Sequence, residues 1–343
     1  MSRSTWSRTA GTAAARRTAA TLAALALVTT ACGTTAGDDG EDTAAESGPV
    51  SGLRVMVPNS PGSGYDQTAR AATKAMEDGG LAKTVEVFNV AGAGGTVGLQ
   101  RLVNEKGNGD LLMQMGLGVV GAEFTNKSQA KLAETTPIAG LIEEAEVIVV
   151  PEDSPYQDLK ALTDAWKADP GGLPVGGASN PGGPDHLTPM LLAEEVGVDP
   201  TTVNYVPYDG GGELLAGILG KKLAFAATGV SEVAEQAKAG DLRILAVTSD
   251  EPVEGIDAPT LKDEGVDLTF TNWRGIVAAP DISDADRTKL TELVTEMHGS
   301  KEWKDALETN GWTDAFMTGE EFETFLTSES ERVQGVLSGL GLA

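Results

Sequence analysis

The sequence predicts an α/β fold divided into two domains. From Leu53 onward, short apolar runs alternate with stretches whose apolar residues recur at helical spacing, which is typical of mostly parallel sheets covered by helices. The roughly 290 residues of this pattern exceed what one compact core usually serves. Four glycine-rich segments lead into predicted helices, so several loops are available to a ligand.

The N-terminal 31 residues predict an export signal. They contain four arginines and no acidic residue, and the apolar run 19–28 ends shortly before Cys32. This run is too short for a membrane span of about 20 residues. Cys32 is the only cysteine, and its place after Ala31 resembles a bacterial lipobox with Thr29 where leucine is usual. We expect lipidation at Cys32; an unmodified cysteine in a secreted tail is the alternative, and the export route stays open.

The charge of the remaining chain excludes some partners. Removal of residues 1–31 takes away four of 25 basic residues and none of 51 acidic ones, which leaves a net charge of 21 − 51 = −30 with histidine neutral. Such a chain lacks the basic face that nucleic acid binding needs, and charge does not attract it to an anionic membrane. An anionic ligand must therefore be held by local donors against the overall field.

The order of elements follows from the apolar pattern. Residues 32–51 are small and polar, which predicts a disordered tether. Strands are expected over 53–58, 85–90, 111–115, 137–141, 147–150, 203–207, 223–227 and 242–247. Helices are expected to begin near Asp66, Gly95, Gln157, His186, Gly212 and Ser231, and three more over 283–298, 301–309 and 319–338.

We expect the chain to cross between the two domains twice, near 146–151 and 269–277, which makes a hinge. Residues 52–148 and 271–343 would then form the first domain, and residues 149–270 the second.

The first two glycine-rich loops belong to the first domain. VPNSPGSGYDQTAR, residues 57–70, joins a strand to a helix start, where glycines let a ligand approach the backbone and free N–H groups could hold an anion. An ordinary turn with Asp66 as the N-cap is the alternative. VAGAGGTVGLQ, residues 90–100, lacks the third glycine of a dinucleotide fingerprint and the Gly-Lys-Ser/Thr of a phosphate loop, so a nucleotide cofactor is not expected.

The other two loops belong to the second domain. GGASNPGGPDHL, residues 176–187, offers side-chain donors at Ser179 and Asn180, and Asp185 is its candidate helix cap. YVPYDGGGE, residues 205–213, places Tyr208 and Asp209 between a strand and a helix. Loops at the carboxyl ends of strands in open α/β sheets line ligand clefts, so the four loops are expected to share one cleft.

His186 is the residue in these loops that suggests catalysis. The sequence has two histidines, neither at metal-ligand spacing nor beside a Gly-x-Ser-x-Gly elbow, which favours a packing or capping role and predicts neither a metal site nor an enzyme. An exported hydrolase or lyase that uses His186 with Asp185 or Asp209 is the alternative.

Seven ordered segments resemble one family. They are VPNSPGSGYDQTAR, VAGAGGTVG, GGPDHL, YVPYDGGGELLAGILGKKLAF, AGDLRILAVTS, DAPTLKDEGVDL and NWRGIVAAP, and the resemblance covers nearly all of residues 53 to about 325. This order is similar to that of the substrate-binding receptors of tripartite tricarboxylate transporters, the Bug-type periplasmic binding proteins. The resemblance implies a two-lobed Venus-flytrap fold that captures a small di- or tricarboxylate, citrate-like in kind, and delivers it to two integral membrane permease subunits.

The resemblance also implies which residues surround the ligand. The expected ligand-binding residues are Ser60, Pro61, Gly62, Ser63, Gly64, Tyr65, Asp66, Ala93, Gly94, Gly95, Ser179, Asn180, His186, Tyr208, Asp209 and Thr228. In this family the carboxylate is held mainly by backbone N–H groups and water. The sequence suits this, because the four loops themselves contain no arginine and Arg70 lies a turn into its predicted helix. Thr228 stands where many members carry an acidic residue, so the far end of the ligand is read differently here. A monomer without cofactor, lipid-anchored to the outer face of the cytoplasmic membrane, is expected; a sensor of the same fold that signals to a kinase is the alternative.

Overall fold

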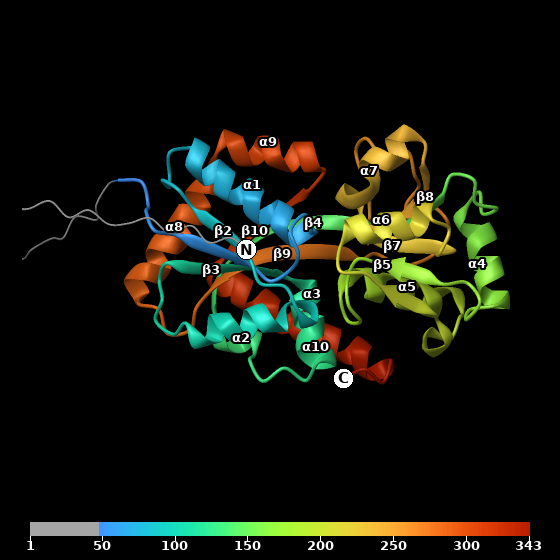
Figure 1. The fold of residues 1–343 in the computed structure, drawn as a ribbon, viewed down its shortest axis with the longest axis horizontal. Helices are drawn as coiled ribbons and strands as arrows, with labels where there is room; N and C mark the ends of the chain where they lie inside the picture. Colours follow the sequence, from blue (N-terminus) through green and yellow to red (C-terminus); the bar gives the residue numbers. More distant parts are fainter. Residues whose placement is uncertain (1–47) are drawn as a thin grey trace, which may run out of the picture. The chain divides into compact units, whose positions relative to one another are not determined.

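A computed structural model describes residues 48–343 of the protein (Figure 1). The predicted export signal, Cys32 and the predicted tether as far as Ser47 lie outside the described residues. The predictions made for them therefore stay predictions.

The described residues form a ten-stranded curled sheet with the order β2-β1-β3-β9-β4-β7-β5-β6, and β8 and β10 also pair with β4. The strands are β1 (Arg54–Val57), β2 (Glu86–Asn89), β3 (Leu111–Gly116), β4 (Thr136–Pro151), β5 (Val175–Gly177), β6 (Tyr205–Pro207), β7 (Phe225–Gly229), β8 (Leu242–Val247), β9 (Thr271–Ala278) and β10 (Thr313–Thr318).

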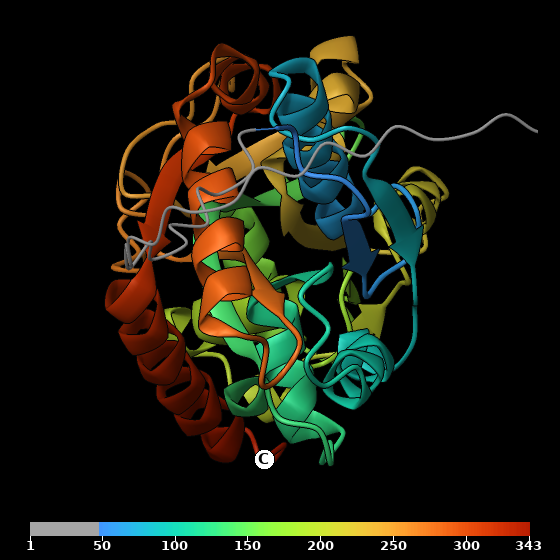
Figure 2. The same cartoon turned by 90° about the vertical axis from the view of Figure 1, so that its left-hand side faces the viewer.

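Helices cover both faces of the sheet in each of two lobes (Figures 1 and 2). They are α1 (Gly64–Asp78), α2 (Thr96–Asn104), α3 (Leu117–Thr125), α4 (Leu159–Ala168), α5 (Pro184–Val196), α6 (Gly211–Leu219), α7 (Val230–Ala239), α8 (Asp284–Gly299), α9 (Lys301–Asn310) and α10 (Gly319–Gly339), with short 3-10 turns at Ala93–Gly95, Leu132–Glu134 and Pro200–Thr202. Four of these helices begin with an ordinary side-chain cap, since Ser63, Asp158, Ser283 and Ser300 each accept an N–H of the first turn. No helix between residues 48 and 343 combines the length and the apolar content of a membrane span.

The two-lobed α/β class predicted from the sequence is confirmed, but the sheet is mixed. Parallel pairing joins β1 to β2 and β3, and β5 to β6 and β7. β9, β10, β7 and β8 all pair antiparallel with β4, and β3 pairs antiparallel with β9. The expectation of two mostly parallel sheets was therefore wrong for the centre of the molecule, because the chain leaves the first lobe along β4 and returns along β9 in the opposite direction.

The strand β4 joins the two lobes. Its first half pairs with β9 and β10, and its second half pairs with β7 and β8. The strands predicted over 137–141 and 147–150 are thus one strand of 16 residues. Glu143, Glu144 and Glu146 interrupt the apolar pattern in the sequence, which is why one strand was read as two.

Buried apolar side chains form three clusters. The first comes from residues 53–142 and 270–337, with Leu187 as an addition, and the other two come from residues 145–261. The predicted crossings near 146–151 and 269–277 fall on β4 and β9, which pair side by side. The exact domain boundaries of 52–148 with 271–343 and of 149–270 stay a prediction.

Candidate ligand-binding site

The first glycine-rich loop ends at the start of α1. Ser63 is the N-cap, and its Oγ accepts the N–H of Asp66 at 3.4 Å, so the alternative that Asp66 caps the helix is wrong. The N–H groups of Gly64 and Tyr65 precede the first helical hydrogen bond and are free to face a ligand. A Cβ on Gly64 would lie 2.8 Å from Cζ of Arg274, so only glycine lets this guanidinium pack against the loop.

Asp66 lies one turn into α1 and holds the first loop in place. Its carboxylate accepts the N–H of Gly62 at 2.9 Å, Nε of Arg70 at 2.8 Å and Nδ2 of Asn89 at 2.9 Å. Burial alone would raise the pKa of Asp66, but the hydrogen bonds from Arg70, Gly62 and Asn89 outweigh it and hold the pKa below its usual range. Asp66 therefore positions the loop and does not line the pocket.

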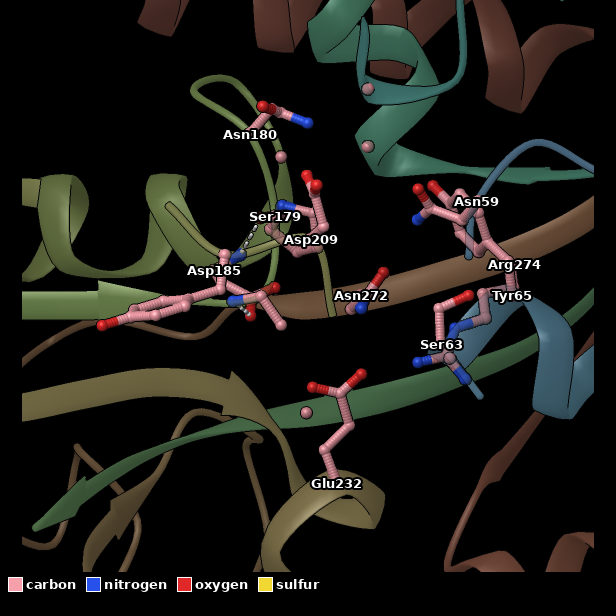
Figure 3. Close-up of a pocket in the computed structure, with 18 residues that line it drawn as sticks. Asn59, Ser63, Tyr65, Ser179, Asn180, Asp185, Asp209, Glu232, Asn272 and Arg274 are labelled. Atoms are coloured by element: carbon pink, nitrogen blue, oxygen red, sulfur yellow. Dashed lines mark hydrogen bonds between the residues drawn. The ribbon is translucent and has the colours of Figure 1, made fainter. Parts of the chain in front are cut away.

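A pocket with a cavity volume of about 60 Å³ lies where the two lobes meet (Figure 3). This volume suits a small molecule, since a buried water needs about 10–15 Å³ by the same measure. The lining residues are Asn59, Ser63, Gly64, Tyr65, Gly94, Gly118, Ala178, Ser179, Asn180, Gly183, Pro184, Asp185, Tyr208, Asp209, Gly229, Glu232, Asn272 and Arg274. All four glycine-rich loops contribute to one cleft, as their sequence positions predicted.

Four helices begin at this pocket. Gly64 opens α1, Gly118 lies in the first turn of α3, Pro184 opens α5, and Gly229 is the N-cap of α7; all four line the cavity. The positive end of a helix dipole favours negative charge by about 0.3–1 kcal/mol near the surface. The pocket therefore offers backbone donors and positive helix ends from both lobes to an anionic group.

The lobes contact one another beside the pocket. Gly121 of α3 packs against the backbone of Gly182 in the third loop, where a Cβ on Gly121 would lie 2.9 Å from the Cα of Gly182. Oγ1 of Thr125 donates to the carbonyl of Pro181 at 3.1 Å. This glycine-to-glycine contact holds α3 close to the start of α5, at the end of the pocket that Gly118 and Pro184 line.

The structure brings half of the predicted ligand-binding residues to the pocket wall. Those that line it are Ser63, Gly64, Tyr65, Gly94, Ser179, Asn180, Tyr208 and Asp209. Those that do not line it are Ser60, Pro61, Gly62, Asp66, Ala93, Gly95, His186 and Thr228. Gly62 donates to Asp66, which positions the first loop, and Oγ1 of Thr228 donates to the lining residue Glu232 at 2.6 Å, so both act from behind the wall.

His186 lies behind the pocket wall and not in it. It is buried, its Nδ1 accepts the N–H of Gly182 at 3.2 Å, and its ring meets the ring of Tyr205 edge-on. Burial lowers the pKa of His186 to about 4, so the ring is neutral at pH 7. Asp185 is not the helix cap expected from the sequence, because Gly183 is the N-cap and the Asp185 carboxylate accepts the N–H of Ala178 at 2.6 Å. The contacts of His186 with Gly182 and Tyr205 match the packing role expected from the sequence.

Sequence reasoning missed the charged and amide side chains that come from strands and helix interiors. Asn272 and Arg274 reach the pocket from β9, and Glu232 reaches it from the first turn of α7. Apart from Arg70, which lies within α1, the four segments contain no arginine, yet Arg274 supplies a guanidinium to the pocket from a strand that the sequence did not predict. The sequence offered one signal for this residue: Arg274 is the only charged residue in the apolar run 273–279.

Arg274 is the one cation among the pocket-lining residues of the described chain, and it is paired with an acid behind the wall. Its Nη2 forms an ion pair with Glu144 of β4, and its Nη1 donates to Oγ1 of Thr68 at 3.1 Å. The side chains of Arg274 and Glu144 are 2% and 0% exposed. Oε1 of Glu144 also accepts the N–H of Ser231 at 2.7 Å, so this pair joins β9, β4 and the start of α7.

Besides the exposed Asp209, three further acids around the pocket lack an ion-pair partner among residues 48–343: Glu146, Asp185 and Glu232. Burial, followed by repulsion from Asp185, raises the pKa of Glu232 to about 8 and raises that of Glu146 well above its usual range. Burial also raises the pKa of Asp185 to about 6. Each group therefore resists ionisation in the absence of a compensating positive charge.

No cluster of three or more acids, histidines or cysteines within the described residues is arranged to hold a metal ion.

These shifts predict a loss of stability above pH 6.5. The folded state binds the protons of Glu232 and Asp185 more tightly than the unfolded state, so the free energy of unfolding falls as the pH rises toward about 8. The lowered pKa of His186 makes the free energy of unfolding rise with pH, but this rise is complete near the unperturbed histidine pKa of 6.5. The stability that comes from the lowered pKa of Asp66 is lost only in acid. We expect the melting temperature to fall between pH 6.5 and 8.

The variant Glu232→Gln tests the source of this fall. It removes one titrating group and keeps the hydrogen bond from Thr228, so its melting temperature should depend less on pH in the same window. Differential scanning calorimetry at four pH values measures both curves. Identical slopes for the two proteins would contradict the role given to Glu232.

Comparison with known proteins places the chain in a family. The model of the tripartite tricarboxylate transporter family receptor matches residues 68–342. The chain belongs to this receptor family. Protein BugT of Bordetella pertussis is 26% identical over 304 residues, which cover 87% of this chain and 91% of BugT. The resemblance seen in the sequence is thereby confirmed.

Two solved structures show that the fold is shared. The periplasmic binding protein BugD has a TM-score of 0.77 at 22% identity, over 86% of this receptor chain and 99% of BugD. MatC from Rhodopseudomonas palustris with bound malate has a TM-score of 0.74 at 22% identity, over 84% of this receptor chain and 99% of MatC.

Proposed function

We propose that this receptor is an extracytoplasmic solute-binding lipoprotein that captures a small di- or tricarboxylate in the pocket between its lobes. It delivers the ligand to two integral membrane permease subunits and does not transform it. The observation that carries the proposal is the pocket itself, where both lobes present helix starts and free backbone N–H groups to one small cavity.

The available donors suffice for a receptor of ordinary affinity. A hydrogen bond to a charged group contributes about 1.5–3 kcal/mol, and micromolar affinity requires about 8 kcal/mol in total. The N–H groups of Gly64 and Tyr65, with the side chains of Ser179 and Asn180, could supply this when the lobes close around the ligand. That MatC binds malate supports the ligand class.

Export, lipid attachment, the absence of catalysis and the oligomeric state are proposed together with this function. The N-terminal arginines, the short apolar run and Cys32 support export and lipid attachment at the outer face of the cytoplasmic membrane. The packed position of His186 supports a receptor over a hydrolase or lyase. A monomer is the proposed oligomeric state.

Isothermal titration of the purified protein tests the ligand class. We expect saturable binding of at least one member of a panel that contains malate, succinate, adipate, citrate, tartrate and aspartate, with micromolar affinity and no chemical change in the ligand. Phosphate and leucine are the controls, because neither carries the two carboxylates that the class requires. Absence of binding across the whole panel would refute the proposed function.

A further inference from the structure

One wall of the pocket presents hydrogen-bond acceptors that lack donors. Glu232 keeps part of its surface toward the cavity, and Figure 3 shows its carboxylate pointing toward Asn272 of β9. Oδ1 of Asn272, a residue that is 6% exposed, has no hydrogen-bond partner among residues 48–343, and neither has Oε2 of Glu146. Because Nδ2 of Asn272 donates to Oε1 of Glu146 at 3.2 Å, both of these unsatisfied atoms are acceptors.

A carboxylate ligand cannot satisfy this wall by itself. An ionised carboxylate has acceptor oxygens only, so it brings no hydrogen atom to Glu232 or Asn272. It also places further negative charge beside acids that already repel one another. A proton on one of these acids meets both requirements, because a neutral carboxyl group donates through its O–H and carries no charge. The wall therefore needs protons when the pocket holds an anion.

The charged groups around Glu232 favour a proton on it. Glu144 and Glu146 of β4 and Asp185 of α5 surround this side chain. Arg274 of β9 is the one cation among these groups in the described part of the chain, and its guanidinium is already paired with Glu144. A buried carboxylate without a counter-charge is strongly unfavourable and takes up a proton more readily than one in water.

Two helix starts and one hydroxyl act in the opposite direction. Glu232 lies in the first turn of α7, and a Cβ on Gly211 at the start of α6 would lie 2.9 Å from its carboxyl carbon. Oγ1 of Thr228 donates to its Oε2, which leaves Oε1 to carry a proton. Asp209, in the loop before α6, is exposed. Burial, followed by repulsion from Asp185, outweighs these contacts and raises the pKa of Glu232 to about 8.

We infer that the receptor binds its ligand together with a proton from the solvent, and that Glu232, as a neutral carboxylic acid, donates a hydrogen bond to a carboxylate of the ligand. The inference rests on the proposed function and adds a second bound species to it. No bond of the ligand breaks, and the proton returns to the solvent when the ligand leaves. The affinity for the ligand therefore falls as the pH rises and Glu232 loses its proton.

Calorimetry of the unmodified protein measures the proton directly. The tightest-binding simple dicarboxylate among malate, succinate and adipate is titrated at pH 8 in HEPES and in Tris. The ionisation enthalpies of these buffers differ, so the difference in heat gives the number of protons exchanged. We expect uptake of about half a proton per ligand, because Glu232 is about half ionised at this pH before binding and neutral afterwards. Absence of uptake, or release of protons, would overturn the inference.

The pH profile of the affinity provides a second measurement. We expect the affinity for the same ligand to fall about tenfold from pH 7 to pH 9 as Glu232 ionises in the free protein. The carboxylates of the ligand are fully ionised over this range. Burial raises the pKa of Tyr65 to about 12 and lowers that of His186 to about 4, so neither titrates there. Circular dichroism at pH 9 verifies folding, and an affinity independent of pH would contradict the inference.

Glu232→Gln assigns the proton to this residue. The amide keeps a donor but takes up no proton, so we expect the uptake at pH 8 to disappear and the ratio of the affinities at pH 7 and pH 9 to fall to about threefold or less. Glu213→Gln is the matched control, because Glu213 lies in the first turn of α6 but is exposed and outside the pocket. Uptake retained in Glu232→Gln, or lost in Glu213→Gln, would refute the assignment.

The measurements on the unmodified protein decide the inference even if a variant fails to fold. Failure of the two levels is also distinguishable. Binding of a dicarboxylate without proton uptake would leave the proposed function intact and reject the protonated Glu232. Absence of binding across the whole panel would reject the proposed function itself.

Discussion

Replacing Arg274 with leucine is expected to lower the free energy of unfolding by about 3–5 kcal/mol, the cost of leaving one member of a buried ion pair without its partner. The variant removes the cation that contacts Glu144 and the donor to Thr68, and it leaves the acids around the pocket with no guanidinium among them. Denaturant unfolding followed by circular dichroism measures the change.

An exposed pair provides the matched control for this prediction. Arg287 and Glu323 also form an arginine–glutamate pair, but their side chains are 40% and 44% exposed. Breaking such a pair costs about 0–1 kcal/mol, so Arg287→Leu should be nearly neutral. The double variant Arg274→Leu with Glu144→Gln should recover part of the loss, because the unpaired charge is then gone. Similar losses for Arg274→Leu and Arg287→Leu would contradict the buried-pair argument.

Substituting Gly121 with alanine is expected to weaken ligand binding at least about tenfold, which corresponds to about 1.4 kcal/mol. The new methyl group would collide with the backbone of Gly182, where no side chain can rotate away, so α3 and the third loop must separate. The pocket then opens at that end and loses contacts with the ligand. Titration with the tightest ligand of the panel measures the affinity, and small-angle scattering measures the separation of the lobes.

The control for this variant is Gly335→Ala in α10. A Cβ at Gly335 meets no atom within 4 Å, so the change should leave affinity unchanged and stabilise the helix by up to about 1 kcal/mol. Both variants are expected to remain folded, because Gly121 faces the other lobe. Unchanged affinity in Gly121→Ala would show that the contact between Gly121 and Gly182 does not belong to the ligand-bound state.

The sequence predicted the loops better than the strands that join them. Glycines after apolar runs correctly placed all four loops at one pocket, since strand ends and helix starts are encoded by neighbouring residues. The strand β9 was read as a crossing because its pattern contains Asn272 and Arg274. A buried arginine inside a strand can be predicted only if its ion-pair partner is known, and Glu144 lies 130 residues from Arg274 in the chain. Long-range ion pairs of this kind have no local signal.

The same reason explains why His186 and Thr228, which the family resemblance implied as ligand-binding residues, do not line the pocket. α5 and β7 turn their side chains toward Gly182 and Glu232, and their ligand contacts stay a prediction. Asp209 and Tyr208 were found because a loop exposes nearly every side chain it carries. Glu232 was missed because a first-turn glutamate is more often a favourable partner of the helix dipole than a ligand residue.

The pairing of β4 with β9 has a mechanical consequence. The lobes are joined by two adjacent antiparallel strands, with Ala145 opposite Thr271, and not by a flexible linker. Motion of one lobe relative to the other must bend this ribbon, so small dihedral changes are distributed over several residues and the interstrand hydrogen bonds are kept. The lobes therefore move against the stiffness of a hydrogen-bonded ribbon.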